Sequence, residues 1–201
     1  MALADDKDEP FYRAFSVIMD GLIAIAEGGA ENGIEQTSAA LVAYRATGAR
    51  LLSAHVLAYL AKALAERGRF DEARQSLGDA IATISATEER WCESDITRTA
   101  GEVALLSSAH DASAAERYFE RALAIARAQN AKGWELRAAT SLARLRGHVG
   151  RRAEALALLA SLRAEFVEGF DTRDLIEASA TLRELEGRDI RHDAQLAIES
   201  A

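Results

Sequence analysis

Arginine, threonine and histidine side chains recur at helical spacing in the second half of the sequence. Arg137, Thr140, Arg144 and His148 follow one another at intervals of three, four and four residues, which places them on one face of a helix. Two guanidinium groups on one face can hold a carboxylate or a phosphate through paired hydrogen bonds. The alternative is structural, because Arg137 and Arg144 can instead pair with neighbouring acids such as Glu102. Both readings stay open at the level of sequence.

Catalytic motifs are absent from the sequence. It contains no Gly-x-x-x-x-Gly-Lys phosphate loop, no Gly-x-Ser-x-Gly nucleophile elbow and no His-Glu-x-x-His zinc helix. Asp189 and His192 form a single Asp-x-x-His, whereas a metal site in a helical bundle needs several such groups. Cys92 has no histidine or other base near it in sequence, so we interpret it as a structural thiol. We therefore expect no enzyme, no metal and no cofactor, and we interpret Trp91 and Trp134 as core residues.

Composition predicts an all-α protein. Apolar residues make up 49% of the 201 residues, Ala and Leu dominate them, and the one proline, Pro10, stands where a helix begins. The single cysteine is typical of the reducing cytoplasm, and no uncharged run reaches the roughly 20 residues needed to span a bilayer. The net charge of −8 argues against direct nucleic-acid binding. Basic residues outnumber acidic ones between Arg117 and Arg163, which indicates either a site for an acidic partner or a solvated helix face.

Apolar spacing and glycine breaks predict nine helices within a domain that covers residues 10–186. We expect a disordered N-terminus at 1–9 and a polar tail at 187–201. The expected helices lie at about 11–27, 31–47, 50–67, 70–85, from 89 onward, from 113 onward, up to 150, 151–166 and 172–185.

The helices form a repeat. Small residues stand near the start of the second helix of each predicted pair, at Gly33, Ala73, Ala115 and Ala155, with spacings of 40, 42 and 40. A second set of small residues precedes each turn, at Gly21, Ala61, Gly101 and Ala143. Small residues let two helix backbones approach closely where they cross. The period therefore predicts a helical-hairpin solenoid of about four helix pairs with a C-terminal capping helix.

In such a solenoid the first helix of each pair lines the inner, concave surface. Positions one turn away from the packing stripe then point into a groove. The candidates at these positions are Arg137, Thr140, Arg144 and His148 in the fourth pair, Asp95, Arg98 and Glu102 in the third, and His55 and Lys62 in the second. We expect them to bind a protein or peptide partner.

The repeat pattern resembles tetratricopeptide repeats in a lengthened form. The segments Arg90–Glu93, Gly101-Glu102, Ala115–Arg127, Trp134–Leu145 and Glu168–Thr172 are similar to the C-terminal repeat region of large bacterial signalling proteins and related transcriptional regulators. In those proteins an adenylate/guanylate cyclase or DNA-binding domain and an AAA-type ATPase module precede the repeats. The resemblance implies a non-catalytic scaffold or regulatory domain. A small-ligand sensor that controls a linked cyclase, ATPase or transcription factor is the alternative.

The first predicted helix is apolar on nearly every side. Phe15, Ile18, Leu22 and Ile25 leave few polar positions around it, and a helix of this kind is covered by another element. Either a later segment of the chain covers it, or a second copy or a preceding repeat does. Self-association through this helix is therefore expected as one possibility.

Overall fold

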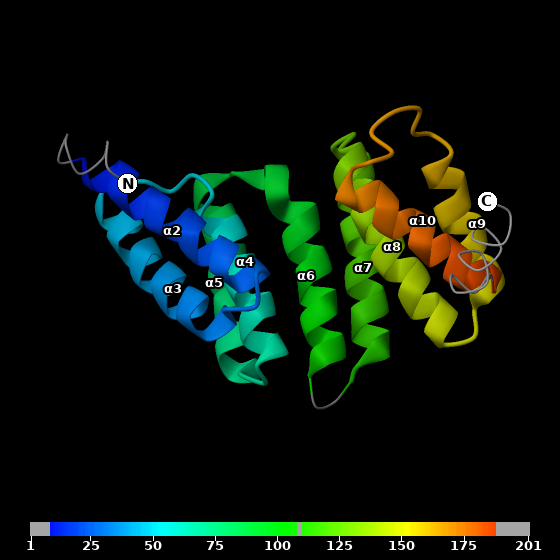
Figure 1. Ribbon diagram of the computed structural model, residues 1–201, viewed down its shortest axis with the longest axis horizontal. Coiled ribbons are helices and arrows are strands. Elements are labelled where there is room, and N and C mark those ends of the chain that lie inside the picture. Colours follow the sequence, from blue (N-terminus) through cyan, green and yellow to red (C-terminus); the bar gives the residue numbers. More distant parts are fainter. Residues whose placement is uncertain (1–8, 108–109, 188–201) are drawn as a thin grey trace, which may run out of the picture. The chain divides into compact units, whose positions relative to one another are not determined.

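The computed structural model describes residues 9–107 and 110–187, and it divides the chain into two compact units, residues 1–111 and 112–201. The described residues contain nine α-helices, one short 3-10 helix and no strand (Figure 1). The prediction of an all-α, tetratricopeptide-like arrangement of helical hairpins is confirmed. The predicted disordered N-terminus and polar tail lie almost entirely outside the described residues.

The first unit consists of two helical hairpins followed by a single helix. Its helices are α2 (Pro10–Ala26), α3 (Ala30–Ala46), α4 (Ser53–Glu66), α5 (Phe70–Thr87), the 3-10 helix η1 (Arg90–Cys92) and α6 (Glu93–Leu106). Helix α2 packs along α3 and α4 packs along α5, while α6 lies against both α4 and α5. The core of this unit runs through α4, which is the most buried of its helices.

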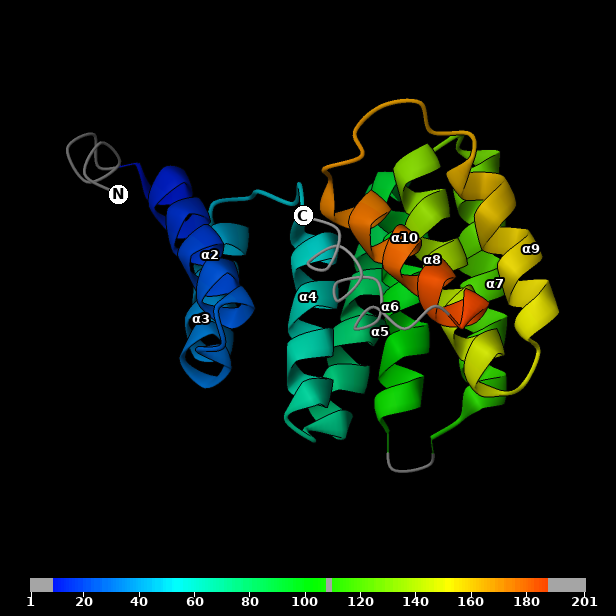
Figure 2. The ribbon, with the colours of Figure 1, turned by 45° about the vertical axis from the view of Figure 1, so that its right-hand side comes forward.

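The second unit is centred on α8. Its helices are α7 (Ala112–Ala128), α8 (Lys132–His148), α9 (Arg152–Arg163) and α10 (Arg173–Glu186). Helix α8 packs against α7 on one side and α9 on the other, and α10 lies across α8 and α9 (Figure 2). The predicted capping helix therefore covers one face of the last hairpin.

The helix ends agree with the sequence signals to within a few residues. The third helix begins at Ser53 and not at Arg50, because Leu52 takes a left-handed backbone conformation with φ of 65°. That conformation cannot continue a right-handed helix. At the other end, α9 stops at Arg163, three residues before the predicted end at Phe166.

Small residues mark the helix crossings, as the repeat predicts. Ala61, Ala73, Ala143 and Ala155 are fully buried. The closest crossing joins α2 to α3 at two glycines: a Cβ atom added to Gly33 would lie 2.6 Å from the carbonyl oxygen of Gly21 and 2.9 Å from the backbone nitrogen of Ile25. Only a residue without a side chain fits there.

An arginine in the turn between two hairpin helices links three elements in both units. In the first unit Arg69 pairs with Glu72 at the start of α5 and reaches back to Glu31 on α3, at 2.7 and 2.9 Å. In the second unit Arg151 pairs in the same way with Glu154 on α9 and Glu116 on α7, at 2.6 Å each. The turn thus ties the second helix of one pair to the second helix of the pair before it.

Helix α2 keeps a partly uncovered apolar side. It buries Ala14, Ile18 and Gly21, but Tyr12 and Ile23 are more than half exposed. Self-association through this side is untested by the structure and stays a prediction. No helix in the described part of the chain is long and apolar enough to cross a bilayer.

Candidate functional site

Five of the sequence-predicted groove residues form one polar network in the first unit. The Nε2 atom of His55 lies 3.2 Å from Oδ2 of Asp95, and the Nε–H of Arg98 donates to Oδ1 of Asp95 at 2.8 Å. Arg98 also pairs with Glu102, whose other carboxylate oxygen lies 3.1 Å from Nζ of Lys62. The network therefore joins α4, which carries His55 and Lys62, to α6.

The helical repeat of each element explains why these side chains meet. His55 and Lys62 are seven residues apart on α4, and Asp95, Arg98 and Glu102 follow at three and four residues on α6. Because α4 and α6 are first helices of successive pairs and pack side by side, the two polar stripes face each other. Contacts between the two helices therefore hold the network in place, and we call these five residues the frame.

Asp95 is the anchor of this frame. Its side chain is 4% exposed. Burial by itself raises the pKa of this carboxyl, but the hydrogen bond from His55 and the charge and hydrogen bond of Arg98 outweigh it and lower the pKa to about 2. For Arg98 burial by itself lowers the pKa. The charges of Asp95 and Glu102 more than offset this effect, so the pKa of Arg98 is raised above its usual value. Both groups are thus ionised at neutral pH.

Two aromatic rings adjoin the His55 ring of the frame, at the end where α4 and η1 begin. The His55 ring lies 4.9 Å from Tyr59 and 5.2 Å from Trp91, centroid to centroid. Tyr59 is 43% exposed and Trp91 is 40% exposed. The indole N–H of Trp91 donates to Oε1 of Glu89 at 3.0 Å, and the same oxygen accepts the backbone N–H of Leu52 at 3.3 Å. The frame and these rings are the α4/α6 face, defined by His55, Tyr59, Lys62, Glu89, Trp91, Asp95, Arg98 and Glu102.

The interpretation of the tryptophans as core residues is wrong for Trp91, whose ring stands at the surface. Trp134 is half-buried. Spacing shows that Trp91 shares a face with Asp95, but it does not show whether another element covers that face. Tyr59 was not predicted, although it stands one helical turn after His55 and could have been found by that spacing.

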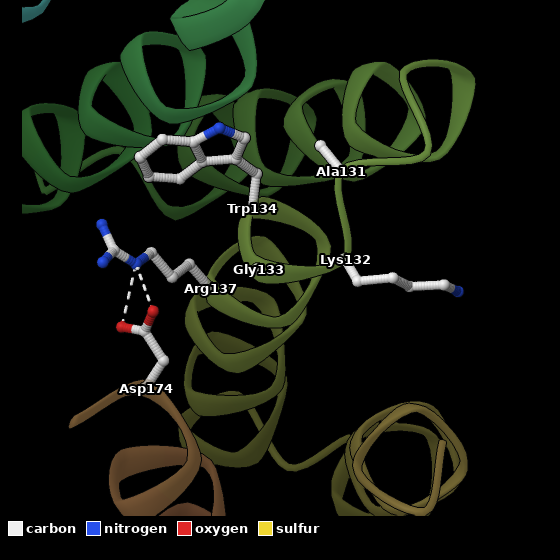
Figure 3. A pocket seen from close by; sticks show the side chains of 6 residues that line it. All are labelled: Ala131, Lys132, Gly133, Trp134, Arg137 and Asp174. Carbon is white, nitrogen blue, oxygen red and sulfur yellow. Dashed lines mark hydrogen bonds and ion pairs between the residues drawn. The ribbon is translucent and has the colours of Figure 1, made fainter. Parts of the chain in front are cut away.

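The other predicted arginine site, on α8, is occupied from within the second unit. The Nε–H of Arg137 lies 2.8 Å from both carboxylate oxygens of Asp174 on α10, and its Cζ atom lies 4.8 Å from the ring centroid of Trp134. These side chains border a cavity of about 340 Å³, which is also lined by Ala131, Lys132 and Gly133 (Figure 3). In Figure 3 the Lys132 side chain points away from Arg137, and it pairs with Glu135 and Glu165.

The remaining α8 positions are held in the same way. Arg144 donates to the hydroxyl of Thr181 at 3.0 Å and lies 3.7 Å from Glu177, both on α10. Thr140 is buried and donates to the carbonyl oxygen of Leu136 at 2.8 Å, while the Nδ1 atom of His148 lies 2.7 Å from the carbonyl oxygen of Arg144. Arg137 and Arg144 thus have acidic partners, but these partners are on α10.

The described residues hold no group of three or more His, Cys, Asp and Glu side chains that could hold a metal ion. Asp189 and His192 lie outside the described residues. Cys92 is buried, and burial raises the pKa of its thiol to about 11, which leaves little thiolate at neutral pH.

The hairpin order and the packing of α4 with α6 and of α8 with α10 define a tetratricopeptide-like α-solenoid. Two solved structures share this fold: the nearly identical TPR-like repeats assigned to a kinesin light chain of Podosopora anserina, and a single-substitution variant of the same repeats. Each superposes with a TM-score of 0.61 at 19% sequence identity, over 94–95% of this chain and 92–93% of the other. No protein-family model matches the chain, and no curated protein matches its sequence. The structural likeness establishes the fold, and it gives no support to the cyclase or ATPase context.

Proposed function

We propose that the chain is a non-catalytic scaffold that binds a protein segment along the α4/α6 face. The observation that supports this most directly is the frame itself: a buried, ionised Asp95 fixes side chains from two helices, and Lys62, Tyr59 and Trp91 stand partly exposed beside it. Preorganised groups lose little conformational entropy on binding. Exposed aromatic side chains next to a fixed polar frame are also the residue types that dominate the energy of protein interfaces.

The proposal is tested with a random peptide library displayed on phage and panned on the purified chain. We expect enriched peptides to bind the wild type and to lose affinity at least about tenfold when Tyr59 and Lys62 are both changed to Ala. Ile81→Ala is the matched control, because Ile81 is an exposed residue on α5 and is not among the residues that define the α4/α6 face. Circular dichroism verifies that each variant is folded. The proposal is overturned if no peptide is enriched, or if the double variant binds as well as the wild type.

Of the α8 positions, Arg137, Arg144 and His148 belong to the same proposal as a second contact surface, whereas the Thr140 side chain is buried. Their partners on α10 change how they are tested. Charge reversal of Arg137 breaks its pair with Asp174 and disturbs α10. A loss of binding in that variant would therefore not distinguish a lost contact with the partner from a displaced α10. Arg144→Gln is the gentler change, because Gln can still donate to the Thr181 hydroxyl.

A small-ligand sensor is the second candidate function, and the cavity beside Trp134 and Arg137 favours it. Its volume of about 340 Å³ lies within the range of small-molecule sites. In this hypothesis the chain acts in the cytoplasm and regulates a cyclase, an ATPase or a transcription factor, as the sequence resemblance implies. A thermal-shift screen with nucleotides, phosphates and sugars should then raise the melting temperature by a few degrees for one class of ligand. A flat response across the panel would count against it.

A further inference from the structure

The two tryptophans of the chain stand near the starts of two successive first helices. Trp91 and Trp134 are 43 residues apart, each near the start of a first helix, and together they are the full tryptophan content of the sequence. Their surroundings differ. The ring of Trp134 is covered by the guanidinium of Arg137, which is in turn paired with the Asp174 carboxylate. The second unit thus contains a complete tryptophan, arginine and carboxylate arrangement.

In the first unit a carboxylate also lies beside the tryptophan, but it is that of Glu89, which accepts the indole N–H of Trp91 directly. The carboxylate of Glu89 contacts the indole N–H of Trp91 and the backbone N–H of Leu52, which are both neutral donors. Among the described residues no Lys or Arg pairs with Glu89, and none lies over the ring of Trp91. The nearby arginines are engaged elsewhere: Arg90 with Glu93, and Arg98 with Asp95 and Glu102.

The surroundings of Trp91 and Glu89 favour the binding of a cation. An aromatic face attracts a positive group, and a carboxylate that accepts the indole N–H adds electron density to that ring. The unpaired negative charge of Glu89 adds a direct attraction. An aliphatic side chain placed over Trp91 would instead shield Glu89 from water without giving it a partner, which is unfavourable. A carboxylate or phosphate would be repelled.

We propose that Trp91, Tyr59 and Glu89 form a subsite for an arginine side chain of the bound protein segment. The guanidinium lies over the exposed indole and pairs with the carboxylate of Glu89, which reproduces between two molecules the arrangement of Trp134, Arg137 and Asp174. Arginine fits better than lysine, because its planar guanidinium stacks on a ring while its edge donates to a carboxylate. This inference rests on the proposed function, since it names the side chain that the α4/α6 face selects.

The test uses the two indole N–H signals in a nuclear magnetic resonance spectrum of the full chain. The probe is an acetylated and amidated pentapeptide with arginine at its centre and alanine at the other four positions. The control peptides carry citrulline, which has the same shape without the charge, or norleucine at the centre. We expect the arginine peptide to shift the Trp91 signal in a saturable way and the Trp134 signal to stay in place. The citrulline and norleucine peptides should bind at least about three-fold more weakly.

Two neighbouring substitutions sharpen the result. Glu89→Gln keeps an oxygen that can accept from Trp91 and Leu52 but removes the charge, and it should weaken the arginine peptide about three-fold while leaving the citrulline peptide unchanged. Glu88→Gln removes an adjacent exposed charge and should have little effect. Equal affinity for the arginine and citrulline peptides, no shift of Trp91, or no effect of Glu89→Gln would each overturn the proposal.

The library experiment separates this inference from the proposed function. If library peptides bind the α4/α6 face but are not enriched in arginine and do not shift Trp91, the arginine subsite is wrong and the scaffold function stands. If no library peptide binds at all, the scaffold function itself fails, and the arginine subsite fails with it.

Discussion

Asp95 links the stability of the first unit to pH. Its pKa in the folded chain is about 2, below the ordinary value of 3.8, so the folded state takes up this proton less readily than the unfolded state. The resulting stabilisation is fully present above about pH 5 and is lost as the pH falls from 4 towards 2. We expect the ionised Asp95 carboxylate to contribute about 2 kcal/mol to the free energy of unfolding at neutral pH. Urea unfolding between pH 7 and pH 2.5 measures this loss.

Asp95→Asn isolates the share that belongs to this one carboxylate. The variant should be less stable than the wild type at pH 7, and the difference should shrink as the pH falls below about 4, because Asp95 of the unfolded wild type then takes up its proton while the folded carboxylate does so only near pH 2. A difference that stays constant down to pH 2.5 would show that the variant loses packing and not the charge.

Cys92 should be unreactive in the folded chain. It is buried, and burial raises its pKa to about 11, so both access and thiolate content are low. At pH 8 we expect a disulfide-exchange reagent such as dithiobis(nitrobenzoate) to react at least about 100-fold more slowly with the folded chain than with the chain unfolded in urea. Comparable rates in the two states would mean that Cys92 opens to solvent in the native state.

At the residue scale, sequence spacing placed the residues of the polar network on one surface, but it predicted neither their pairing nor their surroundings. His55, Lys62, Asp95, Arg98 and Glu102 were predicted on one surface because steps of three, four and seven residues fix a helix face. Which helix lies opposite is a long-range property. The acidic partners of Arg137 and Arg144 were therefore expected at positions such as Glu102, whereas the structure places them on α10.

At the scale of elements, the crossing of α2 and α3 depends on two glycines. Gly33→Ala places a methyl group within 2.7 Å of the Ile25 side chain and closer still to the Gly21 carbonyl oxygen, so the two helices must separate. We expect a loss of about 1–3 kcal/mol in the free energy of unfolding, the usual cost of overpacking. Thermal or urea unfolding followed by circular dichroism measures it.

Gly78→Ala is the matched control for this substitution. Gly78 is also inside a helix, α5, but it is exposed and an added Cβ there meets no other atom. Alanine should raise stability there by about 0.5–1 kcal/mol, because it favours the helix. If both substitutions changed the free energy of unfolding alike, helix propensity and not the close crossing of α2 and α3 would explain the effect of Gly33→Ala.

The helices and their repeat could be predicted because their signals are local. Glycine breaks at Gly28, Gly68 and Gly150 and the 40-residue period of small residues are all visible in the chain. The arginine links of Arg69 and Arg151 were not predicted, although both follow a glycine turn and precede a glutamate by three residues. Their second partners, Glu31 and Glu116, lie 38 and 35 residues earlier, and only the packing of successive pairs brings them near.

At the scale of the whole molecule, the apolar side of α2 bears on whether the chain associates with itself. Helix α3 covers one strip of α2, while Tyr12 and Ile23, eleven residues apart and so on one face of the helix, stay 58% and 55% exposed. Exposed apolar side chains on one face are a common contact between protein copies. We expect light scattering at increasing concentration to show a mass above the 21.7 kDa of one chain.

Substitution of two equally exposed isoleucines distinguishes a specific contact between copies from nonspecific hydrophobic association. Ile23 on α2 and Ile81 on α5 are both 55% exposed, but only Ile23 belongs to the apolar side of α2. Ile23→Glu places a charge in the proposed contact and should weaken association at least about tenfold, since an isoleucine buried there contributes about 1.5–3 kcal/mol. Ile81→Glu should leave association unchanged. A wild-type chain that stays a monomer at every concentration would show that α2 needs no second copy, and the uncovered strip would then require a different partner.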